Sequence, residues 1–489
     1  MSGSATRASA SSFALLSRDR AWSAAEVRAA GDTVAAALEA EGVGEGAVVA
    51  HQFRLDPGSA AAITAVAMEA DPERAQVLAP AHAEWTSHER DAFIAAVQPV
   101  AALTGEDTTW PADGWTSRSV AVPGMGDIGL HLRCASAPGS GRRWAGVGAG
   151  AIIATSGTDG RPRFAAHEWR SLRANAIASN ERLDYGADDR WLATLAWAHV
   201  GGLAVPLRAA AAGATVALAG PRFDAASVAR ALGELAMTHL SLVPAMLHGL
   251  LAADARPPGS LRVVLLGGAA TPPDLTDRAL EAGWPIALTY GLTEAGSQVT
   301  TSTPSEVRAG DRSTGVPLTG VEVRIRPPGH APAGPAEAPA PGHIEVRGDT
   351  LFRGYVGEAA RPAAAWFATG DLGRLDEQGR LEVTGRLRDR IVSGGANVDP
   401  AQVEAVLATH PEVGEAAVIG LTDERWGQVV VAVVAGDDPD LPARLDPWCR
   451  ERLSGPRLPR RWEMLDRLPR TVTGKVDRAR LRDLLRGDL

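Results

Sequence analysis

A loop rich in glycine and hydroxyl residues follows an apolar stretch near the middle of the chain. Residues 155–163 read Thr-Ser-Gly-Thr-Asp-Gly-Arg-Pro-Arg, directly after a strand predicted over Ala149–Thr155. Glycines let backbone N–H groups turn toward an anion, and hydroxyl groups add donors with little bulk. A loop of this kind is more often an ordinary turn, and its spacing is not that of the Walker phosphate loop. By itself it is only a candidate phosphate site.

Two further motifs place a carboxylate beside glycine and hydroxyl groups. Residues 289–296 read Thr-Tyr-Gly-Leu-Thr-Glu-Ala-Gly after a strand predicted over Pro285–Leu288, and Glu294 could hold Mg²⁺ next to a nucleotide phosphate. Asp371 ends the motif Thr-Gly-Asp, where a carboxylate could accept hydrogen bonds from two vicinal ribose hydroxyls. Taken singly, each motif fits a solvated turn equally well.

The fourth motif, residues 469–475, ends on the only lysine of the protein. Lys475 is one of 49 basic residues, and the other 48 are arginines. A compact ammonium fits between two anionic oxygens where a planar guanidinium needs more room. A lysine kept at one place, on a glycine turn, therefore indicates a functional charge that meets phosphate or carboxylate.

The elements that must position these residues alternate between strands and helices. A helix is predicted over Ser23–Glu41 and a strand over Gly46–Ala50. Later segments continue the alternation: strands over Ala214–Leu218, Leu261–Leu266, His343–Arg347, Arg380–Thr384, Glu415–Ile419 and Gln428–Val434, helices over Pro400–Thr409 and Asp477–Leu485, and a proline-rich surface loop over Arg326–His343. This order predicts an α/β protein with mostly parallel sheets. The expected architecture is a large N-terminal domain of layered α/β sheets with a β-rich subdomain, and a small mobile α+β C-terminal domain.

The composition of the chain excludes several classes of protein. The 489 residues are 45% hydrophobic and 22% charged, with a formal net charge of −9, so the chain is globular and lacks the basic excess of a general nucleic-acid binder. No apolar run reaches 18 residues and no signal pattern opens the chain, which argues against a membrane span or secretion. Two distant cysteines suit a reducing cytosol, so we expect a cytoplasmic protein.

Together, the four motifs in this order resemble the superfamily of adenylate-forming enzymes, which includes acyl- and aryl-CoA ligases, luciferase and peptide-synthetase adenylation domains. The resemblance covers about residues 20 to 485, with further support from residues 342–348, Gly354-Tyr355 and residues 393–397. It implies ATP, Mg²⁺ and coenzyme A as cofactor or co-substrates, and a small-molecule carboxylic acid as substrate. It also implies an N-terminal domain over residues 1–387 and a C-terminal domain over 388–489, with a hinge near Arg388, in a monomer or homodimer.

The resemblance also implies roles for single residues. Lys475 would bridge the substrate carboxylate and the α-phosphate, Thr293 would contact that phosphate, Glu294 would hold Mg²⁺, and His199 would form a wall of the acyl pocket. The residues that would bind the nucleotide are Thr155, Ser156, Gly157, Thr158, Gly160, Arg163, Gly268, Ala269, Thr289, Tyr290, Gly291, Asp371 and Arg386. Two positions depart from the family pattern: Arg163 stands where a lysine is usual, and Asp159 where the family has a threonine.

Three stretches favour one branch of the superfamily. Residues 196–202, 265–269 and 290–299, with Ser393-Gly394-Gly395 and Asn397, are most similar to o-succinylbenzoate–CoA ligases and their aryl-acid relatives. The expected reaction is adenylation of an aryl or aryl-alkyl acid, followed by thioester formation with coenzyme A. Alternatives are a same-fold enzyme of secondary metabolism with another acceptor (a carrier protein, or nitrite with an amino-aryl acid, as in a diazotase) and a catalytically silent nucleotide-binding protein. The motifs leave the acceptor open.

Overall fold

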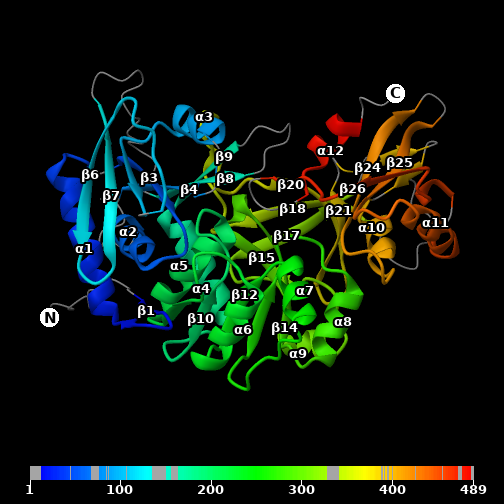
Figure 1. The fold of residues 1–489 in the computed structure, drawn as a ribbon, viewed down its shortest axis with the longest axis horizontal. Coiled ribbons are helices and arrows are strands. Elements are labelled where there is room, and N and C mark those ends of the chain that lie inside the picture. The colour runs from blue at the N-terminus through cyan, green and yellow to red at the C-terminus, as the bar shows by residue number, and fades with distance from the viewer. Residues whose placement is uncertain are drawn as a thin grey trace.

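The computed structural model places most of the chain in two large sheets, a small sheet and a C-terminal unit. It describes residues 13–44, 46–67, 76–83, 85, 87–105, 107–134, 150–155, 163–327, 341–386, 389, 391–393, 396–398, 400–423, 426–453, 455–471 and 476–485. Figure 1 shows the N-terminal elements at one end of the molecule and the C-terminal unit, in orange and red, at the other. Within the described residues, no helix has the length and apolar character needed to cross a membrane.

The first large sheet has nine strands in the described part of the chain, and its central strands are parallel. In spatial order they are β16 (Val316–Pro317), β15 (Ser297–Thr301), β14 (Ile286–Leu292), β13 (Val263–Leu266), β12 (His239–Leu242), β10 (Arg190–Ala193), β11 (Thr215–Leu218), β1 (Ala14–Leu16) and β2 (Ala21–Trp22). The carboxyl end of β13 lies beside the middle of β14, since Leu266 lies opposite Leu288. Ligands of parallel α/β sheets bind at this kind of edge.

The second large sheet, with eight strands among the described residues, is parallel in its middle and antiparallel at both sides. Its order is β19 (Gly354–Tyr355), β9 (Arg163–Glu168), β8 (Gly150–Thr155), β4 (Val77–His82), β3 (Val48–Phe53), β5 (Ala101–Thr104), β7 (Gly126–Arg133) and β6 (Trp115–Val122). The small sheet is antiparallel and consists of β17 (Val321–Arg326), β18 (Gly342–Gly348), β20 (Phe367–Leu375) and β21 (Leu381–Arg386).

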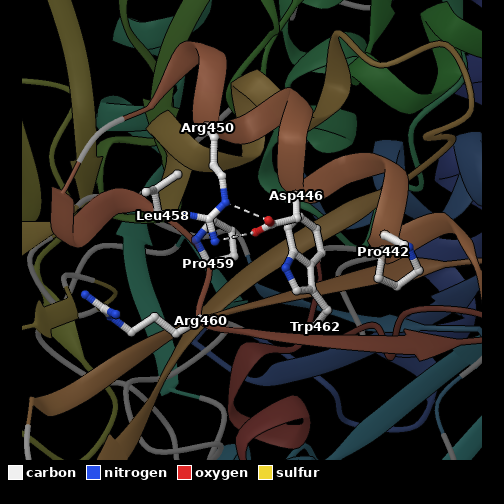
Figure 2. Close-up of a pocket in the computed structure, with 8 residues that line it drawn as sticks. Pro442, Asp446, Arg450, Leu458, Pro459, Arg460 and Trp462 are labelled. Atoms are coloured by element: carbon white, nitrogen blue, oxygen red, sulfur yellow. Dashed lines mark hydrogen bonds and ion pairs between the residues drawn. The ribbon is translucent and has the colours of Figure 1, made fainter.

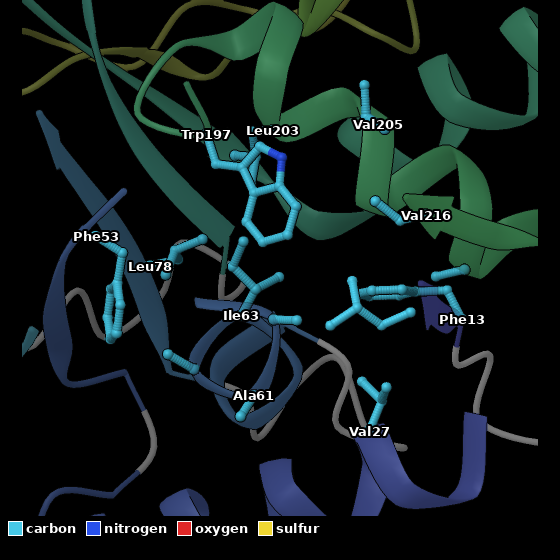
Figure 3. Packing of buried hydrophobic residues seen from close by; sticks show 14 of the residues in the cluster. Phe13, Val27, Phe53, Ala61, Ile63, Leu78, Trp197, Leu203, Val205 and Val216 are labelled. Carbon is cyan, nitrogen blue, oxygen red and sulfur yellow. The ribbon is translucent and has the colours of Figure 1, made fainter. Parts of the chain in front are cut away.

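Helices cover the sheets in layers. The N-terminal helices are α1 (Ala24–Ala40), α2 (Pro57–Ala67), α3 (Ser87–Val97), α4 (Trp169–Leu183), α5 (Val200–Ala212), α6 (Ala225–Glu234), α7 (Pro244–Ala252), α8 (Pro273–Glu281) and α9 (Pro304–Arg308). Helices α1, α2, α4 and α5 contribute to the core between the two large sheets, while α6 to α9 pack on the far side of the nine-stranded sheet and α3 on the far side of the eight-stranded one. Figure 3 shows the shared core, with the Trp197 indole pointing into it toward Ile63.

The parallel strands in the middle of the two large sheets are buried on both faces, which explains their nearly continuous apolar sequence. In β3, Val49 faces the shared core, whereas Val48 and Ala50 face α3. The strand also continues beyond the predicted end at Ala50, through two polar residues that are buried. His51 and Gln52 are accommodated because the imidazole lies 3.3 Å from the Ser59 carbonyl and the Gln52 amide donates to the His82 carbonyl at 3.1 Å.

Local signals place the first helix as expected. Ser23 caps α1: its hydroxyl accepts a hydrogen bond from the Glu26 N–H at 3.2 Å, and the Glu26 side chain accepts one from the Ser23 N–H at 2.8 Å. The predicted loop Arg326–His343 is shorter than expected, because Arg326 and His343 pair across β17 and β18. The proline-rich interior of that segment, residues 328–340, lies outside the described residues.

The C-terminal unit has its own sheet and its own cores. The sheet consists of β22 (Ile391–Ser393), β23 (Ala396–Val398), β24 (Ala416–Asp423), β25 (Gly427–Ala435) and β26 (Arg461–Leu465). Helices α10 (Pro400–Ala408) and α11 (Leu441–Arg452) pack on one face, and α12 (Arg478–Leu485) packs on the other. The observed fold is therefore the predicted mixed α/β architecture with a large N-terminal part and a smaller C-terminal one. The expectation of mostly parallel sheets holds only for the middle of the two large sheets, because the small sheet and most of the C-terminal sheet are antiparallel.

Candidate active site

The Asp371 carboxylate is buried and held by two donors from neighbouring elements. Asp371 is 3% exposed and lies opposite Arg386 in the antiparallel pair β20–β21. The Arg386 Nε donates to Asp371 Oδ1 at 2.7 Å, and the Tyr290 hydroxyl donates to Oδ2 at 2.6 Å. The charge of Asp371 raises the pKa of Arg386, and burial, then the Asp371 charge, raise the pKa of Tyr290 well above its usual value. Both donors therefore stay protonated at neutral pH.

A short turn, η1 (Thr293–Ala295), carries Thr293 and Glu294 at the end of β14. The turn is held by strand β9 and by the segment that precedes β19. His167 on β9 lies 2.7 Å from the Thr293 carbonyl through Nε2, and the Phe352 N–H donates to the Glu294 carbonyl at 2.8 Å. The His167 ring is buried, which lowers its pKa to about 4 and keeps it neutral. A neutral imidazole can still donate the single hydrogen bond that holds Thr293.

The Glu294 side chain is held separately from its backbone. The Tyr355 hydroxyl donates to Glu294 Oε1 at 2.6 Å, and among the described residues no hydrogen bond reaches Oε2. Burial, together with the charge of Glu294, raises the pKa of Tyr355, so its hydroxyl remains a donor. Glu294 is half-buried at the sheet edge, so its carboxylate is partly accessible there.

The donor chemistry of this turn fits Mg²⁺ bound jointly with a nucleotide. Mg²⁺ prefers oxygen ligands and is commonly held by one or two carboxylates together with substrate phosphates. Glu294 supplies such an oxygen, and the described residues contain no cluster of three or more histidine, cysteine, aspartate or glutamate side chains that would bind a metal without a substrate. The chain therefore offers part of a coordination shell, which substrate phosphates would complete.

The residues predicted to flank the adenine lie just after β13 and on the neighbouring part of β14. Gly268 and Ala269 are exposed directly after β13, and Gly268 has a positive φ of +80°. Thr289 lies on β14, where its hydroxyl donates to the Thr300 carbonyl at 2.8 Å. Gly291 must be glycine, because a Cβ at this position would collide with the Ser297 carbonyl oxygen. The motif over residues 289–296 thus requires close contact between β14 and β15.

The glycine-rich loop is described only at its ends, Thr155 and Arg163, which are paired across β8 and β9. The residues between them, which include Ser156, Gly157, Thr158 and Gly160, lie outside the described residues. The Arg163 side chain contacts two other residues. Its guanidinium lies 3.4 Å from the centre of the Tyr355 ring and donates to Glu358 at 2.6 Å. The arginine that replaces the usual family lysine is therefore connected to the Glu294 turn through Tyr355.

His199 is the residue immediately before helix α5, at the start of the predicted acyl pocket. Its ring is half-buried and lies 5.2 Å, centroid to centroid, from the ring of His82 at the end of β4. Trp197, two residues earlier, is buried in the core between the sheets. The histidine thus occupies a point where the two large sheets meet.

Further predicted functional positions belong to the C-terminal part of the chain. Lys475 and the hinge residue Arg388 both lie outside the described residues, as do Gly394 and Gly395.

A pocket in the C-terminal unit, shown in Figure 2, lies between α11 and β26. Its lining residues are Pro442, Ala443, Asp446, Arg450, Leu458, Pro459, Arg460 and Trp462. No residue predicted from the sequence lines this pocket, and Arg450 there is paired with Asp446 at 2.6 Å.

A buried polar cluster behind η1 was not anticipated from the sequence. Arg208 on α5 is 1% exposed and donates to Gln298 Oε1 at 2.7 Å, and burial lowers its pKa to about 9. Asn175 on α4 donates to the carbonyls of Ala295 and Gln298, at 3.2 and 2.7 Å. These bonds fix β15 and the end of η1 against α4 and α5. Arg208 is the one charged residue in an otherwise apolar helix, which is a signal in the sequence, whereas Asn175 lies in a helix with many polar residues and carries no such signal.

Comparisons with known proteins agree with this geometry. Residues 4–356 match a protein-family model described as AMP-binding enzyme, and residues 402–475 match one described as AMP-binding enzyme C-terminal domain. The 2-succinylbenzoate–CoA ligase of Bacillus licheniformis is 38% identical over 337 residues, which are 68% of this chain and 70% of that protein. The Bacillus subtilis ligase of the same name is 36% identical over 342 residues, 69% of each chain.

Solved structures with the same fold include enzymes with bound nucleotides. The o-succinylbenzoate CoA synthetase of Bacillus subtilis, in complex with its acyl-adenylate intermediate, superposes with a TM-score of 0.81 at 28% identity, covering 98% of this chain and 96% of that one. The same enzyme in complex with ATP and a magnesium ion gives a TM-score of 0.79 at 28% identity, covering 98% of both chains.

Proposed function

The chain belongs to the AMP-binding enzyme family, and we propose that it joins a carboxylic acid to coenzyme A by way of an acyl-adenylate made from ATP. The observation that carries this proposal is a pair of fixed carboxylates, Asp371 and Glu294, connected through β14 and its following turn. One suits the ribose hydroxyls and the other suits a divalent cation on the phosphates. The names of the two Bacillus ligases support an aryl acid as the substrate.

In the first step, the carboxylate of the acid attacks the α-phosphorus of ATP, and pyrophosphate leaves. The residues of the chain bind and orient the nucleotide for this in-line attack: Asp371 and Arg386 hold the ribose, and Gly268 and Thr289 flank the adenine. Lys475 neutralises the negative charge that meets at the α-phosphate and the acid. Mg²⁺, when bound at Glu294, supplies charge neutralisation on the phosphate oxygens.

In the second step, the thiol of coenzyme A attacks the acyl carbon and AMP leaves. We place the boundary between the two domains after residue 387, with Arg388 as the pivot about which the C-terminal domain rotates between the steps. His199, at the start of α5, forms a wall of the acid pocket. The two unpaired cysteines, Cys134 and Cys449, are compatible with the reducing cytosol as the site of action.

The experiment that tests this function separates the two steps. Exchange of radiolabelled pyrophosphate into ATP is measured with a panel of aryl, aryl-alkyl and aliphatic acids, and the active acids are then supplied with ATP and coenzyme A. We expect exchange with aryl acids and a thioester detected by mass spectrometry. No exchange with any acid would refute the adenylation step. Exchange without a thioester would refute the assignment of the acceptor, and parallel reactions with nitrite or a carrier protein would then identify it.

A further inference from the structure

Two of the three tyrosines in this protein hold the two carboxylates of the candidate active site. Tyr290 donates to Asp371 and Tyr355 donates to Glu294, each at 2.6 Å. The third, Tyr185, donates to a backbone carbonyl, that of Thr215, at 3.3 Å. Phenol hydroxyls bound to carboxylates form short, charge-assisted hydrogen bonds that fix the carboxylate direction.

The Tyr355 ring is itself held on several sides. Phe352 packs against it edge to face, with ring centroids 4.8 Å apart, and Arg163 lies 3.4 Å from the ring centre. Arg163 is in turn held by Glu358, three residues after Tyr355, at 2.6 Å. The short strand β19 pairs Tyr355 with Ala165 on β9, so backbone and side chain are both positioned. Such packing restricts the hydroxyl to one direction.

The stacking also explains why an arginine suits position 163. A guanidinium is planar and can stack on an aromatic face while donating sideways to a carboxylate. A lysine ammonium would keep the charge but would offer neither a flat face nor a two-pronged donor. Arg163 therefore has a role at the Tyr355 ring that does not require contact with a phosphate.

We propose that Tyr355 is a positioning residue that directs the Glu294 carboxylate toward the divalent cation, with Arg163 and Glu358 holding the Tyr355 ring in place. This inference rests on the proposed function, because it takes Glu294 as the residue that binds Mg²⁺. The bond to Oε1 restrains the direction of the carboxylate, and we assign Oε2, which no hydrogen bond from the described part of the chain reaches, to the metal. Partners that orient a metal ligand typically change metal affinity 10- to 100-fold when they are removed.

The test measures metal binding directly and needs no acid substrate. The full-length wild type and Tyr355→Phe are titrated with Mn²⁺ in the presence of a non-hydrolysable ATP analogue, and bound Mn²⁺ is followed by electron paramagnetic resonance. The phenylalanine keeps the ring that Arg163 and Phe352 contact, so the loss is limited to one hydroxyl. We expect Tyr355→Phe to bind Mn²⁺ roughly 10-fold more weakly. AMP binding without metal should be unchanged.

Tyr185→Phe is the matched control, because it also removes a partly buried tyrosine hydroxyl, but one that donates to a backbone carbonyl. We expect it to keep wild-type Mn²⁺ affinity. Arg163→Lys should weaken Mn²⁺ binding by a smaller factor, about 3-fold, since the ring loses its stacked partner but the hydroxyl remains. Thermal unfolding of each variant shows whether a change in binding reflects a general loss of structure.

A double-mutant cycle distinguishes positioning from an indirect effect. If Tyr355 acts through Glu294, Tyr355→Phe should have no further effect on Mn²⁺ binding in a Glu294→Gln background. Equal losses in both backgrounds, or wild-type affinity in Tyr355→Phe, would overturn the inference while leaving the proposed function intact. A wild type that binds neither the ATP analogue nor Mn²⁺ would instead refute the proposed function, and the inference with it.

Discussion

Asp371 carries a buried negative charge whose neutralisation depends on residues far away in the sequence. Tyr290 is 81 residues earlier and Arg386 is 15 residues later, and each donates to a different carboxylate oxygen. A buried carboxylate with fewer partners would be costly, because an unpaired charge loses its hydration without compensation. Since each carboxylate oxygen can accept more than one hydrogen bond, Asp371 is fixed in place and can still accept from a ribose.

Asp371→Asn should therefore weaken nucleotide binding, while the side chain at position 371 keeps nearly the same shape. Each hydrogen bond to a charged group contributes about 1.5–3 kcal/mol, so we expect ATP affinity to fall about 10- to 100-fold in calorimetric titrations. The loss should disappear with 2′,3′-dideoxy-ATP, which lacks the ribose hydroxyls. Asp376→Asn, at the exposed turn of the same hairpin, is the control and should keep wild-type affinity. An equal loss with the dideoxy nucleotide would place Asp371 away from the ribose.

Lys475 gives a second prediction at the scale of one residue. Lys475→Ala should lower the rate of pyrophosphate exchange about 10²- to 10³-fold, the usual effect of removing one charge-stabilising group. Thioester formation from a supplied acyl-adenylate should change much less, because the domain rotation would have moved the lysine away by then. Lys475→Arg should restore little activity, since a planar guanidinium needs more room. The control is Arg480→Ala, an exposed cation on α12; equal losses of both half-reactions in Lys475→Ala would contradict the rotation.

At the scale of elements, the site depends on the tight pairing of β14 with β15. The two strands run antiparallel with a register shift between Tyr290 and Gly291, and Gly296 and Ser297 form the return of the chain. Ser297 has an unusual φ of +134°, and its hydroxyl accepts a hydrogen bond from Arg208 at 3.3 Å. A strained backbone held by a buried donor keeps the Thr293–Glu294 turn in one conformation.

Gly291→Ala tests this pairing. The added Cβ would collide with the Ser297 carbonyl, so β15 must shift. Such overpacking costs about 1–3 kcal/mol, which we expect as a lower unfolding free energy in urea titrations, together with slower pyrophosphate exchange. Gly186→Ala is the control, because an added Cβ meets no atom within 4 Å there. A stable and fully active Gly291→Ala would mean that the strands separate without cost to the site.

At the scale of the whole molecule, three buried histidines make stability depend on pH. Burial lowers the pKa values of His51, His167 and His239 to about 4, from 6.5 for the free side chain. Between pH 6.5 and 4, the unfolded chain therefore binds protons that the folded chain does not. The folded state loses stability as pH falls through this range, and each histidine contributes about 1.4 kcal/mol per pH unit.

Unfolding free energies from urea titrations should therefore fall steeply between pH 6.5 and pH 5 and change little between pH 7 and pH 8. His239→Gln, which removes one buried imidazole far from the carboxylates of the site in sequence, should reduce the slope by about 1.4 kcal/mol per pH unit. Gln378→Ala, at an exposed position without a titratable group, is the control and should keep the wild-type slope. A flat profile in the wild type would show that these rings are protonated in the folded state.

The sequence by itself determined the α/β order, the helix that begins directly after Ser23, the four motifs and the family they resemble. These features are local. Caps, glycine turns and apolar runs act within a few residues, so they can be recognised from the order of the residues alone. Only the tertiary structure decided that Tyr290 meets Asp371 and that Tyr355 meets Glu294, across 81 and 61 residues. Such contacts require atoms to approach within 3 Å, and strand register and sheet packing fix that distance, while spacing along the chain does not.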